Sequence, residues 1–426
     1  MRNVKSVFPE KGVAWPELER EMREVRKDDI KWRDGRMTMS FYFVNDELLE
    51  LTRQAHGMFI LENALFSGEL AKRRGAGFAS ITKFESEVLA MALEILNGPE
   101  GAGGTLTSGG TESILLAVLG AREWARANRP EAKRPTLVLP RTAHPSFNKA
   151  AHLMGLAVTR VPQGIDFRAD VAEMERAIDG DTILVAGSAP CYPFGVIDPI
   201  EELAELAKRR GVWFHVDACV GGFLAPFVRK LGHPVPEFDL GVPGVWSISA
   251  DLHKYGFAAK GASVVLFRDA ALKQYATFSF DDWPYGSYST ATIGGSRTGG
   301  AAAAAWAVMR NLGEEGYLEA ARTIMTVRGR ILDGIAAIGG LAVRGAPHVG
   351  LVSFGSDEFD INAVADRMKA RGWASGRGKE PPSMHLTITP IHAESVERYL
   401  ADLVLSVCEV REGRAAAEGI EAVYAG

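Results

Sequence analysis

The chain has 426 residues, of which 47% are hydrophobic, so it is long enough to bury the core of a large domain with a smaller one attached. Its formal net charge of −5 argues against a nucleic-acid partner, and its three scattered cysteines form no CxxC pair, which argues against a metal site or a disulfide framework. The first residues lack the apolar core of a signal peptide, and no apolar stretch reaches the ~20 residues of a membrane span, so we expect a soluble, cytoplasmic protein without an integral membrane segment.

The N-terminal part of the chain predicts two helices separated by a loop. The first is amphipathic, because four apolar side chains recur at helical spacing among charged neighbours: Trp15, Leu18, Met22 and Val25. The second is expected at about 84–96, where Asn97-Gly98 is a stop signal. The segment 67–81 between them combines small residues with the basic run Lys72-Arg73-Arg74, and we interpret it as a functional or mobile loop.

From about residue 101 to residue 268, short apolar runs alternate with helical patterns. This alternation is typical of a mainly parallel sheet with helices on both faces. The expected strands are Thr136–Leu139, Thr182–Ala186, Val212–Val216, Val245–Ser249 and Ser263–Phe267. The expected helices are Thr111–Asn128, Ser146–Leu156, Val171–Ile178 and Pro199–Arg210.

After Gly299-Gly300 a long alanine-rich helical region leads to a final unit. Strands are expected there near 351–354 and 384–389, and helices near 361–371 and 394–409. We therefore predict three parts: an N-terminal helical segment, a large α/β domain and a small C-terminal α/β domain. Their boundaries are 1–65, 66–304 and 305–426.

Four local motifs are candidates for chemistry, and the first is Thr107-Ser108-Gly109-Gly110-Thr111-Glu112, just before a predicted helix. Glycines let backbone N–H groups approach an anion, and a helix N-terminus adds partial positive charge. The hydroxyl of Ser108 or Thr111 could add a donor. A glycine-rich turn without a ligand would look the same, so this motif alone does not decide between a phosphate site and an ordinary turn.

The second motif is His215-Val216-Asp217-Ala218 at the end of a predicted strand, the edge at which α/β sheets bind ligands. Asp217 could pair with a protonated pyridine nitrogen, which lets such a ring accept electrons. Taken alone, an aspartate that caps the following loop is the simpler interpretation. His215 shares a face with Asp217, and we interpret it as structural.

The third motif, Ser247 to Gly256, places His253-Lys254 just past another strand. Lysines avoid buried positions, and burial or neighbouring cations lower the pKa of an amine, as a Schiff-base lysine requires. His253 could donate to a phosphate. The fourth motif, Gly294 to Gly300, is a loop of small residues around Arg297, which suits close approach to an anion. A surface lysine and an ordinary loop are the alternatives.

Together the four motifs follow the chain order of fold-type I enzymes that use pyridoxal phosphate (PLP). The chain resembles the sphingosine-1-phosphate lyases, a branch of the group II PLP-dependent decarboxylase family, from about Tyr42 to His392. The resemblance is carried by 107–115, 215–225, 247–261 and 295–300, and by Pro382-Ser383-Met384-His385.

This resemblance implies a fold-type I PLP-dependent transferase fold and assigns roles to several residues. Lys254 would form the Schiff base with PLP, Asp217 would hold its pyridine nitrogen, and His144 would stack on its ring. The cofactor would also be contacted by Gly109, Gly110, Thr111, Ser188 and His253. The family's sites lie at a homodimer interface, so the partner's Gly299-Gly300 would complete the cradle.

The resemblance also implies a phosphorylated amino substrate, held by Tyr42, Asn63, Lys260 and Ser296, with Tyr42 as a further acid or base. Two positions depart from the family pattern: Phe66 and Phe194 stand where the family has histidines. Losing such a contact to a phosphate costs about 1.5–3 kcal/mol. One alternative is that the basic run Lys72-Arg73-Arg74 replaces the lost phosphate contact. The other is that the substrate differs, which we would expect if both phenylalanines lined a dry pocket.

The reaction that the resemblance implies is a retro-aldol cleavage of the Cα–Cβ bond of a 2-amino-3-hydroxy compound, giving an aldehyde and an amino product. The main alternative is decarboxylation of an amino acid, for which Arg297 or the 72–74 run would have to place the carboxylate. An aminotransferase and a PLP-binding protein without catalysis are further alternatives. No arginine is placed so that it identifies the dicarboxylate site of an aminotransferase. The presence of Lys254, Asp217 and His144 together argues against a PLP-binding protein without catalysis.

Overall fold

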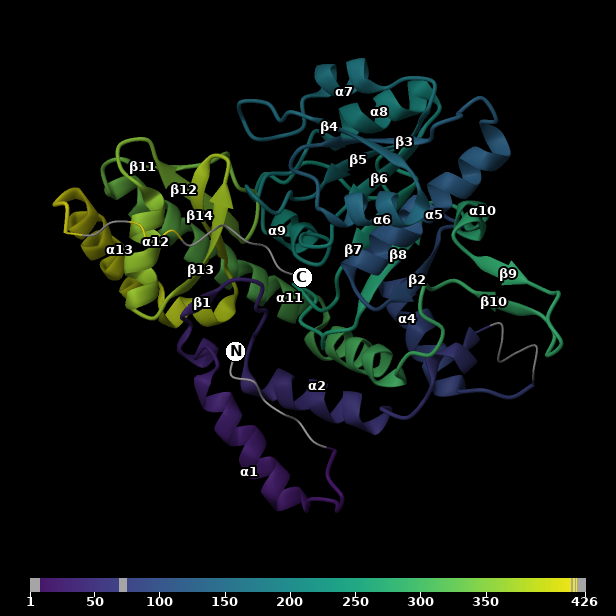
Figure 1. Cartoon of the computed structure of the whole chain (residues 1–426), viewed down its shortest axis with the longest axis horizontal. Coiled ribbons are helices and arrows are strands. Elements are labelled where there is room, and N and C mark those ends of the chain that lie inside the picture. The colour runs from purple at the N-terminus through teal and green to yellow at the C-terminus, as the bar shows by residue number, and fades with distance from the viewer. Residues whose placement is uncertain (1–7, 69–74, 415–416, 418, 420–426) are drawn as a thin grey trace.

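The computed structural model describes the chain except residues 1–7, 69–74, 415–416, 418 and 420–426. A seven-stranded sheet with strand order β2-β8-β7-β6-β5-β3-β4 forms the larger part (Figure 1). Only β8 runs antiparallel to its neighbours, so the expected mainly parallel sheet is confirmed. The strands are β2 (Gly103–Thr107), β3 (Thr136–Pro140), β4 (Ala157–Val161), β5 (Thr182–Ser188), β6 (Trp213–Asp217), β7 (Ser247–Ala250) and β8 (Ser263–Phe267).

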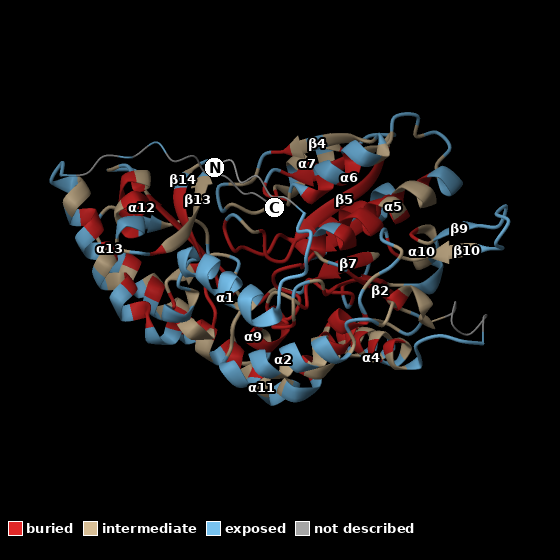
Figure 2. Ribbon diagram, turned by 60° about the horizontal axis from the view of Figure 1, so that its bottom comes forward, coloured by how far each residue is buried: buried red, intermediate tan, exposed pale blue. Residues whose placement is uncertain are grey.

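Helices cover both faces of this sheet because its central strands are apolar on both sides. In β6, Phe214 and Val216 belong to one buried cluster, whereas Trp213 belongs to a second cluster on the opposite face. Figure 2 shows the buried core running through these strands. The flanking helices are α4 (Ala79–Ile95), α5 (Gly110–Asn128), α6 (Ser146–Met154), α7 (Val171–Ala177), α8 (Ile200–Arg210), α9 (Ala225–Lys230) and α10 (Ala270–Tyr275).

A second, five-stranded sheet with order β1-β13-β14-β12-β11 lies in the smaller part. It contains four C-terminal strands and also β1, which pairs in parallel with β13. The N-terminal segment is therefore structurally joined to the C-terminal unit. This link could not be predicted from the sequence, because a strand of two residues is too short to show a pattern. The strands are β1 (Met37–Thr38), β11 (Leu341–Val343), β12 (Leu351–Ser356), β13 (Ala374–Lys379) and β14 (Pro382–Thr387).

Long helices connect and cover the two sheets. The expected alanine-rich helix is α11 (Gly299–Ala337), which is interrupted at Gly313, where φ is 54°. The division at residues 65 and 304 remains a prediction. The other elements are α2 (Asp46–Met58), α12 (Ile361–Ala370), α13 (Val396–Arg411), the hairpin β9 (Phe278–Phe280) and β10 (Tyr288–Thr290), and 3-10 turns at 26–28, 32–34, 64–66 and 390–394.

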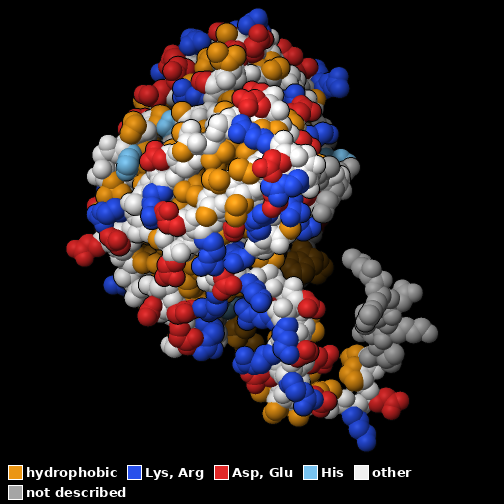
Figure 3. All heavy atoms as spheres, turned by 90° about the vertical axis from the view of Figure 1, so that its left-hand side faces the viewer, with side chains coloured by type: hydrophobic (Ala, Val, Ile, Leu, Met, Phe, Trp, Pro, Cys, Tyr) orange, Lys and Arg blue, Asp and Glu red, His pale blue; other side chains and the backbone are white. Residues whose placement is uncertain are grey.

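The amphipathic helix expected at the N-terminus is α1 (Trp15–Val25), yet it buries none of its residues. Trp15, Met22 and Val25 are each more than 60% exposed. In Figure 3 the lowest part of the molecule, which is α1 in Figure 1, projects from the body and carries hydrophobic side chains among charged ones. None of the helices in the described part of the chain is long and apolar enough to cross a membrane.

Candidate active site

A cavity of about 320 Å³ opens where β2, β5 and β6 end. Because β8 is antiparallel to both β2 and β7, the carboxyl end of β2 reaches the same edge of the sheet as those of the parallel strands. Ligands of open α/β sheets bind at this edge. The cavity is lined by Ser108, Gly109, Gly110, Thr111, Glu112, Ile114, His144, Ser188, Pro190, Tyr192, Asp217, Cys219, Val220, Asp251, His253 and Lys254.

The glycine motif forms the junction of β2 and α5, and no larger residue fits at Gly110. A Cβ atom on Gly110 would lie 2.7 Å from Cys219 Sγ and 2.8 Å from Asp251 Oδ2. The first turn of α5 therefore presents bare backbone N–H groups to the cavity. The side chain of Ser108, which we considered as an extra donor, instead donates to Glu112 Oε2 (2.7 Å).

Asp217 ends β6 and is 7% exposed. Its Oδ1 accepts the N–H of Cys219 (3.1 Å) and lies 3.5 Å from Ser249 Oγ, so the carboxylate is fixed at the cavity wall. His215 is fully buried behind it and bonds Ser247 and Ser249 through its two ring nitrogens. Burial lowers the pKa of His215 to about 4, which agrees with a structural role.

His144 lies in the loop between β3 and α6, and its Nδ1 is 2.9 Å from Ser146 Oγ. Burial lowers the pKa of His144, so the ring is neutral near pH 7. The Ser146 hydroxyl is also 3.0 Å from Thr111 Oγ1, which links this ring to the start of α5. A flat, neutral ring at the cavity wall is suited to packing against an aromatic cofactor.

The structure corrects our expectation about the amine of Lys254. Its Nζ lies 2.9 Å from Asp251 Oδ2, and Asp251 is itself buried. Burial is the largest single influence and lowers the pKa of Lys254, but the charge and hydrogen bond of Asp251, together with Cys219 and Tyr42, raise that pKa well above its usual value. Asp251 lies in the third sequence motif, but we gave it no role there. Its position three residues before Lys254 was the signal that could have identified it as the partner of the amine.

His253 also differs from the simple donor that we expected. Its Nδ1 lies 2.8 Å from the carbonyl oxygen of Ala262, and because a carbonyl only accepts, Nδ1 carries the proton. Burial lowers the pKa of His253, so Nε2, 3.6 Å from Asp251 Oδ2, has no proton in the neutral ring. A bound phosphate dianion would raise this pKa and so favour uptake of a second proton from solvent at Nε2.

The residues predicted to hold a substrate phosphate lie in two pairs. Lys260 Nζ is 5.3 Å from the centroid of the Tyr42 ring and 3.4 Å from the carbonyl oxygen of His253, so this pair lies at the rim of the cavity. Separately, Asn63 Nδ2 donates to Ser296 Oγ (2.9 Å). Neither pair is among the residues that line the cavity, but Lys260 contacts His253, which does.

Gly299 and Gly300 also lie away from this cavity, at the start of α11. A Cβ atom on Gly299 would lie 2.5 Å from Ile81 Cδ1, and one on Gly300 would lie 2.5 Å from the carbonyl oxygen of His56. Both glycines are therefore needed where α11 packs on its own chain. Within one chain the structure does not bring them to the cradle.

Neither phenylalanine that departs from the family pattern lines the cavity. Phe194 is buried and packs against Phe167, with ring centroids 4.4 Å apart. Phe66 is partly buried in the 3-10 turn 64–66. The basic run 72–74 lies outside the described residues.

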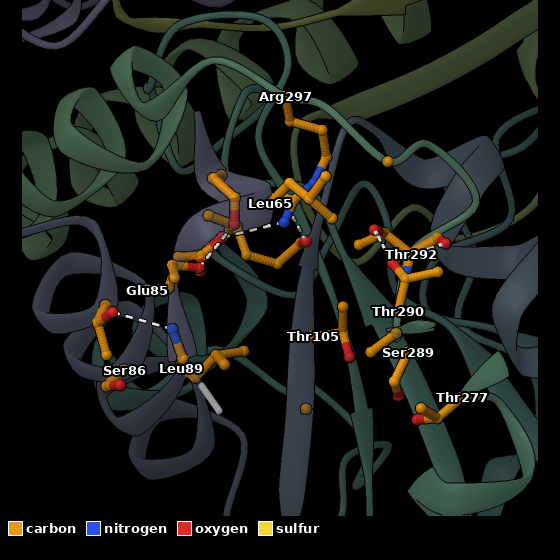
Figure 4. Close-up of a pocket in the computed structure, with 18 of the residues that line it drawn as sticks. Leu65, Glu85, Ser86, Leu89, Thr105, Thr277, Ser289, Thr290, Thr292 and Arg297 are labelled. Atoms are coloured by element: carbon orange, nitrogen blue, oxygen red, sulfur yellow. Dashed lines mark hydrogen bonds and ion pairs between the residues drawn. The ribbon is translucent and has the colours of Figure 1, made fainter. Parts of the chain in front are cut away.

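Arg297, considered for a substrate carboxylate, points into a different and larger cavity of about 670 Å³ beside the edge of β2 (Figure 4). Its Nη2 lies 3.3 Å from Glu85 Oε1, and its Nη1 donates to the carbonyl oxygen of Leu106 (3.2 Å). These contacts occupy the guanidinium away from Lys254. Within one chain Arg297 therefore does not place a carboxylate at the cavity.

The cavity residues fit a PLP molecule. The bare N–H groups at Gly110 suit its phosphate, the anionic Asp217 suits a pyridinium, and Lys254 supplies the one amine of the cavity lining. Fold and site together define a fold-type I PLP-dependent enzyme.

Comparison with known proteins agrees with this class. The pyridoxal-dependent decarboxylase conserved domain matches residues 79–356. Sphingosine-1-phosphate lyase of Arabidopsis thaliana is 41% identical over 410 residues (94% of this chain and 73% of that protein), and the rat lyase is 37% identical over 421 residues (98% and 72%). The solved structure of the Burkholderia pseudomallei sphingosine-1-phosphate lyase superimposes with a TM-score of 0.90 at 39% identity, covering 96% of this chain and 94% of that one.

The chain belongs to the pyridoxal-dependent decarboxylase family as a sphingosine-1-phosphate lyase-like member. It is thus a PLP-dependent lyase. Glutamate decarboxylase of Lactobacillus brevis, with a TM-score of 0.80 at 21% identity, shares the fold.

Proposed function

We propose that this lyase cleaves the Cα–Cβ bond of a phosphorylated 2-amino-3-hydroxy substrate of the sphingoid-base type, giving an aldehyde and a phosphorylated amine. The observation that carries the proposal is the position of Lys260. Burial lowers the pKa of Lys260, and the nearby charge of Lys254 lowers it further. Lys260 Nζ lies 3.4 Å from the carbonyl oxygen of His253, which lines the cavity, so a second ammonium group stands at the rim near Lys254. Two ammonium groups placed in this way favour an anionic ligand between them.

Bound PLP supplies an electron sink for the substrate bond held perpendicular to its ring. In this proposal Lys254 binds the cofactor covalently, Asp217 holds a proton on the pyridine nitrogen, and His144 packs on the ring. The start of α5, with Gly109, Gly110 and Thr111, binds the phosphate together with Ser188 and His253. Tyr42 takes the proton of the substrate hydroxyl.

We further propose a cytoplasmic homodimer with shared sites. Gly299 and Gly300 and the Asn63–Ser296 pair lie outside the cavity of their own chain, which supports a role for them in the site of a partner subunit. The exposed apolar side chains of α1 offer surface for such a partner. Cys191 and Cys219 are buried free thiols, which suits a reducing compartment.

Amino-acid decarboxylation is the second candidate, because fold relatives of this chain include decarboxylases. It requires a group that places a carboxylate at the cavity, and Arg297 of the same chain is occupied elsewhere. The retro-aldol reaction requires no such group.

The test is to incubate the enzyme with phosphorylated sphingoid bases and with a panel of amino acids, and to measure aldehyde and carbon dioxide. We expect aldehyde from the phosphorylated bases. Carbon dioxide from an amino acid without aldehyde would replace the proposal with decarboxylation. Lys260→Met should raise the KM for the phosphorylated substrate about 10- to 100-fold, and that for its unphosphorylated form much less.

Lys254 is tested separately by borohydride reduction and peptide mapping of the holoenzyme. We expect the cofactor adduct on Lys254, and none in Lys254→Ala, because only a primary amine forms this bond. An adduct on another lysine would contradict the assignment.

A further inference from the structure

Glu112, in the first turn of α5, is a buried carboxylate whose role the proposed chemistry leaves unexplained. It is 8% exposed and lines the cavity directly beside the proposed phosphate cradle. A carboxylate at this position repels a phosphate dianion, so cofactor binding does not explain why a glutamate is present here. Its hydrogen bonds show what it does instead.

The two oxygens of Glu112 join two segments that are far apart in the sequence. Oε2 accepts both the N–H and the hydroxyl of Ser108, each at 2.7 Å. Oε1 accepts the N–H of Ile293 (2.8 Å) and that of Gly294 (3.4 Å). Hydrogen bonds to a charged acceptor are about twice as strong as neutral ones, and the start of a helix favours the negative charge.

The second segment is the loop that leads to Ser296 and then to Gly299. It is held at one end by Glu112 and two residues later by the Asn63–Ser296 hydrogen bond. Within one chain Glu112 therefore fixes the distance between its own cradle and the residues that we assign to the site of the partner subunit.

We propose that Glu112 is a positioning residue that fixes the loop 293–296 to the cradle of its own chain and so acts on the substrate site of the partner subunit. This inference rests on the homodimer with shared sites proposed above. It predicts that a substitution of Glu112 in one chain weakens substrate binding at the site that contains Lys254 of the other chain.

The first test measures the loop itself by amide hydrogen exchange in the holoenzyme. Glu112→Gln removes the charge and leaves one oxygen for four donors, so exchange at Ile293 and Gly294 should accelerate about 10- to 100-fold. Glu123→Gln is the matched control, because Glu123 lies on the same helix and pairs with surface arginines. Unchanged exchange in Glu112→Gln would overturn the proposal.

Should Glu112→Gln fail to fold, Glu112→Asp provides the same test. It keeps the charge at the start of α5, but its side chain is one methylene shorter and does not reach both Ser108 and Ile293. We expect faster exchange at one of these two amides, and wild-type exchange at both would overturn the proposal.

The second test uses heterodimers in which one chain carries Lys254→Ala, so that a single working site remains. Glu112→Gln in the Lys254→Ala chain should raise the KM for a phosphorylated sphingoid base about 5- to 50-fold while the cofactor absorbance of the working site stays unchanged. If KM rises only when Glu112→Gln is in the chain with intact Lys254, the action across subunits is refuted. A monomer by sedimentation would refute the shared sites, whereas the exchange result separately decides whether Glu112 holds the loop.

Discussion

At Lys254, burial and charge act on the same amine in opposite directions, and Asp251 decides the balance. Burial disfavours the ammonium form, but a carboxylate 2.9 Å away stabilises it. The cofactor-free protein therefore holds Lys254 protonated near pH 7. Covalent capture of PLP requires that this proton leave, and Asp251 is the acceptor closest at hand.

Asp251→Asn should therefore lower the pKa of Lys254 in the cofactor-free protein. The substitution removes the charge that raises the pKa and leaves the burial that lowers it, so we expect a downward shift. Competitive acylation of Lys254 across a pH series measures it, with exposed Lys208 as internal reference. A midpoint that stays where it is in the wild type would mean that Asp251 does not hold the ammonium form.

Asp217→Asn tests the other charged group of the site. The substitution keeps the shape of the side chain but removes the negative charge that favours a protonated pyridine. We expect the cofactor to remain bound while the chemical step slows by orders of magnitude. Cofactor absorbance and single-turnover rates measure the two effects, and near-normal turnover would place the partner of the ring nitrogen elsewhere.

Among the elements, the junction of β2 with α5 depends most strictly on its sequence. The end of β2, the first turn of α5 and the loop after β7 converge there, and Gly110 lies where Cys219 and Asp251 leave no room for a side chain. The N–H groups at the start of α5 can reach a ligand only if residue 110 has no side chain.

Gly110→Ala should weaken cofactor binding and destabilise the fold. Its Cβ would overlap buried atoms at 2.7–2.9 Å, and overpacking of this kind costs about 1–3 kcal/mol. Gly109→Ala is the matched comparison, because its Cβ would meet His253 at an ordinary 3.5 Å. Equal loss of cofactor affinity and of thermal midpoint in the two variants would contradict the steric explanation.

At the scale of the whole molecule, one chain carries the proposed site residues in two separate sets. One surrounds Lys254, and the other lies around Ser296 and the start of α11. The N-terminal segment joins the smaller sheet through β1 and also carries the exposed face of α1. A homodimer would complete both sets and cover this face.

Mixing inactive Lys254→Ala with an inactive Gly299→Ala variant should therefore restore activity, because in the heterodimer one of the two sites has only intact parts. Each variant is first checked for a native thermal midpoint, since a Cβ at position 299 would meet Ile81 at 2.5 Å. A monomer by sedimentation would count against shared sites, as would subunit exchange without any recovery of activity.

The sequence by itself predicted most of the large sheet from local patterns, and it predicted the cofactor from the order of four motifs and their resemblance to a known family. A glycine turn before a helix, an aspartate at a strand end and a lysine after a buried strand are each contiguous, and buried parallel strands are apolar throughout. Short or half-exposed strands such as β1 and β4 lack that pattern and were missed.

Only the tertiary structure decided the state of each site residue, because that state depends on contacts through space. The protonation of Lys254 follows from the distance to Asp251 and from their common burial, which no spacing rule supplies. The same holds for Glu112, which contacts residues 181 and 182 positions away, and for the two separate pairs Tyr42–Lys260 and Asn63–Ser296. Residue types fix which chemistry is available, whereas packing fixes where each charge and proton lies.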